Sequence, residues 1–212
     1  MQRPWRLARY LLPAVLFAGL LGGCAAPSRI GEVPVADPAA RRAAIGAVST
    51  WEARGRIALK TPGTSGQGNF AWLQDGDRTV LRVAGPFGAG AYEIRWEPER
   101  LTVLSGRGEV AADYTGPDAA RRFLEEQLGW SLPVANARYW LLGLAGPDTS
   151  AAETLDASGL PAALVQDGWD VSYGEYRPQG AVALPRRVDL SSSVGRIRLV
   201  IDHWDLNGGI SD

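Results

Sequence analysis

The feature that most constrains the fold is a two-residue alternation of apolar and polar side chains that begins at Trp51. In "WEARGRIALK" the apolar side chains that share one face are Trp51, Ala53, Ile57 and Leu59, and Gly55 marks a bend. The same alternation recurs in "GNFAWLQ", "TVLRVA", "AYEIRW" and "LTVLS", and turn-rich stretches such as "QDGDR" and "EPER" separate these runs. The pattern predicts an antiparallel meander of half-buried strands.

Two helical patterns interrupt the strands. "GPDAARRFLEEQLGW" and "VANARYWLLGL" repeat apolar residues every three to four positions, namely Ala120, Phe123, Leu124 and Leu128 in the first and Ala137, Trp140, Leu141 and Leu144 in the second. A shorter helix is expected from Pro38, with Asp37 as its N-cap, to about Ser49. Strands resume in "LVQDGWDVSYGEY", "VALPRRVDLSS" and "GRIRLVIDHWD", so the predicted order is sheet, helices, sheet.

The first 23 residues predict a secretory signal peptide, because three arginines precede an apolar run that is too short to cross a bilayer. The run ends in "LGGC", which resembles a bacterial lipobox, so Cys24 is predicted to become the first residue and to carry acyl chains. It is the only cysteine, which leaves it no intramolecular disulfide partner. Residues 24–38 are predicted to be a tether, and residues 39–212 a single domain. Ala25, where an Asp would resemble an inner-membrane retention signal, indicates delivery to the outer membrane.

Charge and composition exclude several classes of function. The formal net charge of −1 falls to −4 when the signal peptide is removed with its three arginines, and this balance argues against a nucleic-acid partner. One histidine and one committed cysteine cannot form the common metal sites. His203 is expected to be structural or exposed, and no "GxSxG" motif is present. We therefore expect neither an enzyme nor a cofactor, apart from the covalent lipid on Cys24.

Tryptophan is the residue type in excess, with eight in the chain. These rings can simply fill a core. A strongly curved sheet covered by amphipathic helices can also enclose more space than its side chains fill, and small barrels hold apolar ligands in this way. Such a ligand would be an acyl chain.

The stretch "GPFGAG" places Phe87 among glycines and a proline that cannot shelter it. Such stretches form surface turns, so the ring is expected to meet something outside the domain. The alternative is that Phe87 folds back over the sheet as a plug.

The chain resembles the LolB family of outer-membrane lipoprotein receptors. The stretches that carry the resemblance run in order from Trp51 to Trp204: "WEARGRIAL", "GNFAWLQ", "GPFGAGAYEI", "LGWSLPVANARYWLLGLAGP", "QDGWDVSYGEY", "LPRRVDL" and "RIRLVIDHW". The resemblance implies an incomplete antiparallel β-barrel with an α-helical lid over an apolar cavity. It also implies a monomer, lipid-anchored on the periplasmic face of the outer membrane, that takes acylated lipoproteins from a LolA-like periplasmic carrier and inserts them into outer-membrane lipid without nucleotide.

The resemblance also suggests which residues perform this task. The loop containing Pro86, Phe87 and Gly88 would enter the membrane. The candidate cavity wall consists of Ile57, Leu59, Phe70, Trp72, Leu81, Ile94 and Trp96, with Phe123, Leu124, Leu128 and Trp140 as the lid. Two other functions stay open at this point: a periplasmic lipid-related hydrolase, with polar groups converging in a cleft, and a structural lipoprotein with a filled core.

Overall fold

The computed structural model describes residues 37–85 and 90–207, apart from the side chain of Leu128. The predicted signal peptide, Cys24, nearly all of the predicted tether, and the loop residues Pro86, Phe87 and Gly88 lie outside the described residues. The domain boundaries and the lipidation site therefore stay predictions.

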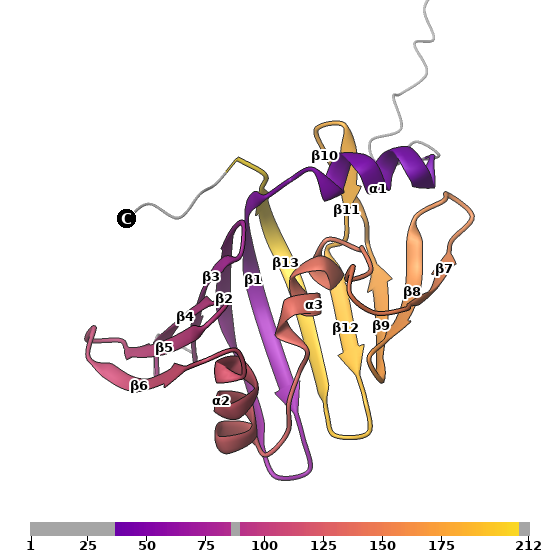
Figure 1. The fold of residues 1–212 in the computed structure, drawn as a ribbon. Helices are drawn as coiled ribbons and strands as arrows, with labels where there is room; N and C mark the ends of the chain where they lie inside the picture. The colour runs from indigo at the N-terminus through magenta and orange to yellow at the C-terminus, as the bar shows by residue number, and fades with distance from the viewer. Residues whose placement is uncertain (1–36, 86–89, 208–212) are drawn as a thin grey trace, which may run out of the picture. The chain divides into compact units, whose positions relative to one another are not determined.

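Eleven strands of the described chain form one antiparallel sheet (Figure 1). Its first half is a meander of consecutively paired strands: β1 (Thr50–Lys60), β2 (Ser65–Asp75), β3 (Arg78–Ala84), β4 (Tyr92–Glu97), β5 (Arg100–Ser105) and β6 (Val110–Thr115). The second half contains β7 (Ala152–Leu155), β8 (Pro161–Gln166), β9 (Trp169–Gly174), β12 (Arg187–Ser191) and β13 (Arg196–Asp205). A separate hairpin, β10 (Arg177–Gln179) with β11 (Val182–Leu184), lies between β9 and β12 in the sequence.

The two halves are joined when the last strand returns to the first. β13 pairs with β1 on one side and with β12 on the other, giving the order β6-β5-β4-β3-β2-β1-β13-β12-β9-β8-β7. β6 and β7 are the two ends of this order and do not pair with each other. The sheet is therefore open, and the prediction of an incomplete antiparallel barrel is confirmed.

Gly55 lies at an irregularity in the pairing of β1 with β13, between Arg54 and Gly55. A Cβ atom added at Gly55 would come within 2.0 Å of the carbonyl oxygen of Val200, so only glycine lets the two backbones approach this closely. The irregular pairing lies at the residue where the sequence predicts a bend.

Three helices of the described part of the chain accompany the sheet. α1 (Pro38–Gly46) begins as predicted, with the Asp37 carboxylate accepting a hydrogen bond from the backbone N–H of Ala39 at 2.9 Å, but it ends before Ser49. α2 (Ala119–Leu128) and α3 (Val134–Leu141) follow β6 in the chain, and the sheet curves around them (Figure 1). Gly129 ends α2 in the left-handed conformation, with φ of 75°.

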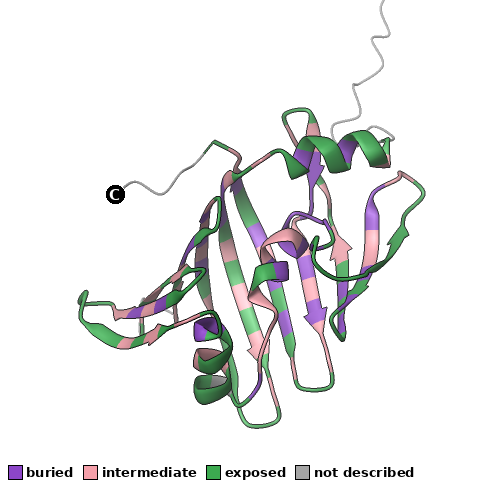
Figure 2. Cartoon of the chain, viewed as in Figure 1, coloured by how far each residue is buried: buried purple, intermediate pink, exposed green. Residues whose placement is uncertain are grey.

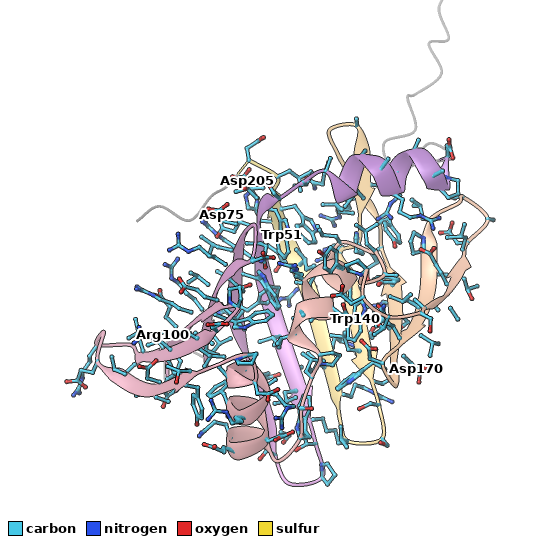
Figure 3. The ribbon with its side chains drawn as sticks, in the orientation of Figure 1. Trp51, Asp75, Arg100, Trp140, Asp170 and Asp205 are labelled. Atoms are coloured by element: carbon cyan, nitrogen blue, oxygen red, sulfur yellow. The ribbon has the colours of Figure 1, made fainter. Side chains whose placement is uncertain are left out.

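The core follows the alternation along the strands, which Figure 2 shows as changing burial from one residue to the next in β12 and β13. Tryptophans occupy its centre. Trp51 stacks on Trp72 with 6.1 Å between ring centroids, and it meets Trp204 at 5.6 Å. Trp51 and Trp140, both labelled in Figure 3, are among the most deeply buried large side chains.

The predicted strands omit the two edges of the sheet, β6 and β7. All four residues of β7 are exposed, and β6 buries none fully. β7 has no buried face, so it carries no alternation that sequence periodicity could reveal. In β6 the signal is weak, because only Ala112 and Tyr114 are half-buried.

Candidate functional site

An apolar cavity of about 290 Å³ lies between the inner face of the sheet and the helices α2 and α3. Apart from Thr79 and Gln127, its walls are aliphatic and aromatic side chains from both halves of the sheet, from both helices and from the connection between them. Among the described residues that line it there is no carboxylate, no histidine and no cysteine. Such a space can accept hydrocarbon but offers no charged group to a polar ligand.

The structure brings nine of the eleven predicted cavity residues together on this cavity: Ile57, Leu59, Phe70, Trp72, Leu81, Ile94, Trp96, Phe123 and Leu124. Strand register explains the grouping. Trp72 lies opposite Leu81, and Leu81 lies opposite Ile94, so one apolar row crosses β2, β3 and β4 on a single face. That these side chains contact acyl chains stays a prediction.

Trp140 is a correction to the predicted lid, because its side chain does not line the cavity. Its ring is fully buried, and its Nε1 donates to the Gln166 side chain at 2.7 Å. On a helix, residue 140 lies about 60° around the axis from residue 137, whereas residue 141 lies about 40° to the other side. Ala137 and Leu141 therefore face the cavity, and Trp140 turns towards the second half of the sheet.

The remaining predicted site residues are not placed. The side chain of Leu128 is outside the described part of the chain, as are Cys24, Pro86, Phe87 and Gly88. The connection that contains Phe87 joins β3 to β4, and Val83 near its start lines the cavity.

The sequence reasoning missed the wall contributed by the second half of the sheet. Leu199 lies opposite Ile57, and Ile197 lies opposite Leu59, so β13 extends the apolar surface of β1. Leu190 of β12 lies opposite Ile197 and also lines the cavity. The alternation in "GRIRLVIDHW" indicated a strand, but nothing local indicated that β1 was its partner.

Polar side chains near the wall are mostly bonded within the protein. The buried Gln74 side chain accepts from Trp72 Nε1 at 2.9 Å and from Thr79 Oγ1 at 2.8 Å, and its amide donates to the carbonyl of Gly76. Trp72 and Thr79 therefore face the cavity with their hydrogen-bonding capacity already used. This arrangement keeps that part of the wall apolar.

A second hollow, which we call the vestibule, adjoins the cavity. It has a volume of about 680 Å³ and shares Trp96, Ala120, Leu132 and Val134 with the cavity wall. Its other lining residues include charged side chains and three prolines, namely Asp77, Arg121, Arg138 and Asp167 with Pro98, Pro117 and Pro133. The apolar cavity thus has a neighbouring hollow whose lining includes charged side chains.

The family model described as "Outer membrane lipoprotein LolB" matches residues 49–204, which include the strands and helices that enclose the cavity. The chain belongs to the LolB family.

Relatives within the family support this placement over about nine tenths of the chain. The outer-membrane lipoprotein LolB of Pseudomonas fluorescens is 35% identical over 195 residues, covering 89% of this chain and 92% of that protein. The LolB of Pseudomonas putida is 36% identical over 200 residues, covering 92% and 95%.

A solved structure supports the fold alone. The LolA superfamily protein from Nitrosomonas europaea superposes with a TM-score of 0.50 at 12% identity, over 76% of this chain and 88% of that one. An open antiparallel sheet around helices is therefore shared between this LolB-family chain and a protein of the LolA superfamily.

Two carboxylates of this LolB-family chain with shifted pKa values, Glu93 and Asp113, do not line the cavity. Burial acts to raise the pKa of Glu93, but hydrogen bonds from Arg82 and Arg95 outweigh it and lower the pKa. Arg100 lowers the pKa of Asp113 on the neighbouring strand. These are ion pairs on the outer surface of the sheet. His203 is exposed, which is one of the two alternatives predicted for it.

The described residues contain neither a membrane-spanning helix nor a cluster of metal ligands. None of the helices placed by the structure has the length and apolar character needed to cross a membrane. Within residues 37–85 and 90–207, no three His, Cys, Asp or Glu side chains cluster in a way that could hold a metal ion.

Proposed function

We propose that this chain is an outer-membrane lipoprotein receptor that shelters the acyl chains of lipoproteins in the cavity under α2 and α3. The observation that carries the proposal is the cavity itself, which has aliphatic and aromatic walls and belongs to a chain of the LolB family. A structural lipoprotein with a filled core would have no such space.

The physical requirement is continuous cover for hydrocarbon. An acyl chain costs about 0.8 kcal/mol per CH₂ when it leaves an apolar environment for water. A receptor therefore has to receive the chains directly from the cavity of a soluble, LolA-like carrier. It must also bind them less tightly than the bilayer does. No nucleotide or other cofactor takes part in the proposed transfer.

The anchor and the loop have separate tasks in this proposal. The lipid on Cys24 holds the domain at the periplasmic face of the outer membrane, while the ring of Phe87 enters the leaflet where cargo is released. One phenylalanine entering lipid gains about 1.5 to 3 kcal/mol. That gain is too small to anchor a protein but large enough to orient an anchored one.

A reconstitution tests both tasks. Carrier loaded with an acylated lipoprotein is mixed with this protein and with liposomes, and acceptance and membrane insertion are measured separately. We expect Phe87→Glu to keep the melting temperature and acceptance but to lose most insertion, and Phe87→Leu to keep insertion. If Phe87→Glu blocks acceptance or unfolds the domain while Phe87→Leu does not, the ring belongs to the core or the cavity.

A soluble version without the signal peptide and Cys24 tests the anchor. It should fold and accept cargo, because the described domain owes none of its core to the lipid. Failure to accept cargo even at high concentration would make the lipid part of the binding site.

An apolar fluorescent probe separates the receptor from the two alternatives. We expect saturable binding of about one probe, competed by an acylated peptide. Absence of binding to the folded domain would favour the structural lipoprotein, and release of free fatty acid from the peptide would favour the hydrolase.

A further inference from the structure

Trp130 differs in its hydrogen bonding from Trp72, the other buried tryptophan of the cavity wall. It is only 7% exposed, and its Nε1 has no hydrogen-bond partner among the described residues. A buried donor without an acceptor is costly, and such groups are rare in folded proteins. An unpaired indole N–H on a ligand cavity points to an acceptor that the ligand supplies.

The position of Trp130 follows from the end of α2. Gly129 adopts the left-handed conformation there, and the chain turns so that Trp130 enters the interior. Its ring lines the cavity and packs against Trp169 with 5.6 Å between ring centroids, and Trp169 lines the vestibule. Trp130 thus lies at the boundary between the apolar cavity and the polar vestibule.

An acyl group attached to a lipoprotein has a polarity boundary of the same kind. Its hydrocarbon tail ends in an ester or amide carbonyl, which joins it to the polar glyceryl-cysteine and peptide. With the tail in the cavity and the peptide in the vestibule, the carbonyl falls between the two.

We propose that the Trp130 indole N–H donates a hydrogen bond to an acyl carbonyl of the bound lipid, and so selects acyl chains over plain hydrocarbon. The inference rests on the proposed receptor function and adds a specificity residue to it. One charge-neutral hydrogen bond of this kind corresponds to about a fivefold to tenfold preference for a ligand with a carbonyl over one without.

The structure supplies a matched control in Trp72. This ring also lines the cavity, but its N–H already donates to Gln74. Changing either tryptophan to phenylalanine removes apolar contact area from the same cavity. Only the change at Trp130 removes a donor that is free to bind a ligand.

The test compares lipid pairs that differ only in the carbonyl. A diacyl-glyceryl-cysteine peptide with ester-linked chains and its dialkyl ether analogue of equal chain length are titrated into the full anchored protein in detergent. Displacement of the fluorescent probe gives both affinities. Phospholipids carry the same ester carbonyls, so an ester and an ether phospholipid are titrated alongside.

We expect the wild type to bind the ester lipopeptide about fivefold to tenfold more tightly than the ether. Trp130→Phe should bind both with equal affinity, whereas Trp72→Phe should weaken both and keep the preference. In a spectrum of ¹⁵N-labelled indoles, the Trp130 N–H resonance should move downfield with the ester and not with the ether. A preference in the lipopeptide pair alone assigns the site to lipoproteins, a preference in both pairs assigns it to acyl esters in general, and either supports the hydrogen bond.

Two outcomes overturn the inference. One is equal binding of ester and ether by the wild type, and the other is an ester preference that survives Trp130→Phe. Both leave the receptor function standing, because lipid still binds. If no lipid of either kind binds the folded wild type, the receptor function itself fails.

Discussion

Arg41 of α1 offers the sharpest test of how the N-terminal helix is held on the domain. Its guanidinium is buried and donates to the carbonyl oxygens of Leu142 and Gly143 at 2.9 and 3.0 Å, and to that of Ala183 at 3.2 and 3.3 Å. The first two carbonyls follow α3, where backbone acceptors lack helical partners and a cation is favourable. One side chain thus joins α1 to α3 and to β11.

The expected loss of stability in Arg41→Met can be estimated from these hydrogen bonds. A hydrogen bond from a charged group contributes about 1.5 to 3 kcal/mol, and Arg41→Met leaves three acceptors without this donor. Two effects reduce the loss: water can reach some of these carbonyls, and the charge no longer has to be buried. Burial disfavours the charged form of the guanidinium and is the main cause that lowers the pKa of Arg41. We expect a net loss of about 3 kcal/mol in the free energy of unfolding, or about 6 to 12 °C in melting temperature.

Urea denaturation of the soluble domain, followed by tryptophan fluorescence, measures this loss. Arg42→Met is the matched control, because Arg42 is largely exposed and its ion pair with Glu153 is long at 3.7 Å. We expect the control to change the free energy of unfolding by at most about 0.5 kcal/mol. Arg41→Lys should recover only part of the stability, because one ammonium group does not match three separate acceptors. If Arg41→Met is no more destabilising than Arg42→Met, the hydrogen bonds described above do not hold α1 in place.

Three further perturbations test the sheet, the surface charges and the cavity. Gly55→Ala should destabilise the domain by about 3 kcal/mol in urea denaturation, because its Cβ would overlap a backbone oxygen of β13, whereas Gly63→Ala, with open space around it, should change little. The hydrogen bond from Arg186 lowers the pKa of Glu175, so this carboxylate stabilises the fold above its unfolded pKa of about 4.5 and loses that contribution as the pH falls. Glu175→Gln should therefore lower stability at neutral pH and leave it unchanged at about pH 2.5. An equal effect at both pH values would show that the ionised carboxylate of Glu175 does not stabilise the fold. Leu124→Trp should fill part of the cavity and weaken fluorescent-probe binding about tenfold with little change in melting temperature, whereas unchanged affinity would place the probe elsewhere.

The central strands, the helices and most of the candidate wall could be predicted from the amino-acid sequence alone. Each of these depends on a local period, and a strand with one buried face repeats every second residue. Phe70 and Trp72 could be assigned to one face without any knowledge of their neighbours, and the structure places both on the cavity. The N-cap at Asp37 and the bend at Gly55 were local signals of the same kind.

Which distant segments meet could not be predicted from the sequence and depends on how the whole chain packs. The return of β13 to β1 places Leu199 opposite Ile57, and no local pattern encodes a pairing between opposite ends of the domain. From its position on α3, the Trp140 side chain could be buried either at the cavity or against the second half of the sheet. In the structure it packs against the second half of the sheet and does not line the cavity. Trp130 lies in a connection whose sequence has no repeating pattern of apolar residues. Its place on the cavity wall and its unpaired N–H therefore arise from the turn at Gly129 and from the packing of the helices against the sheet.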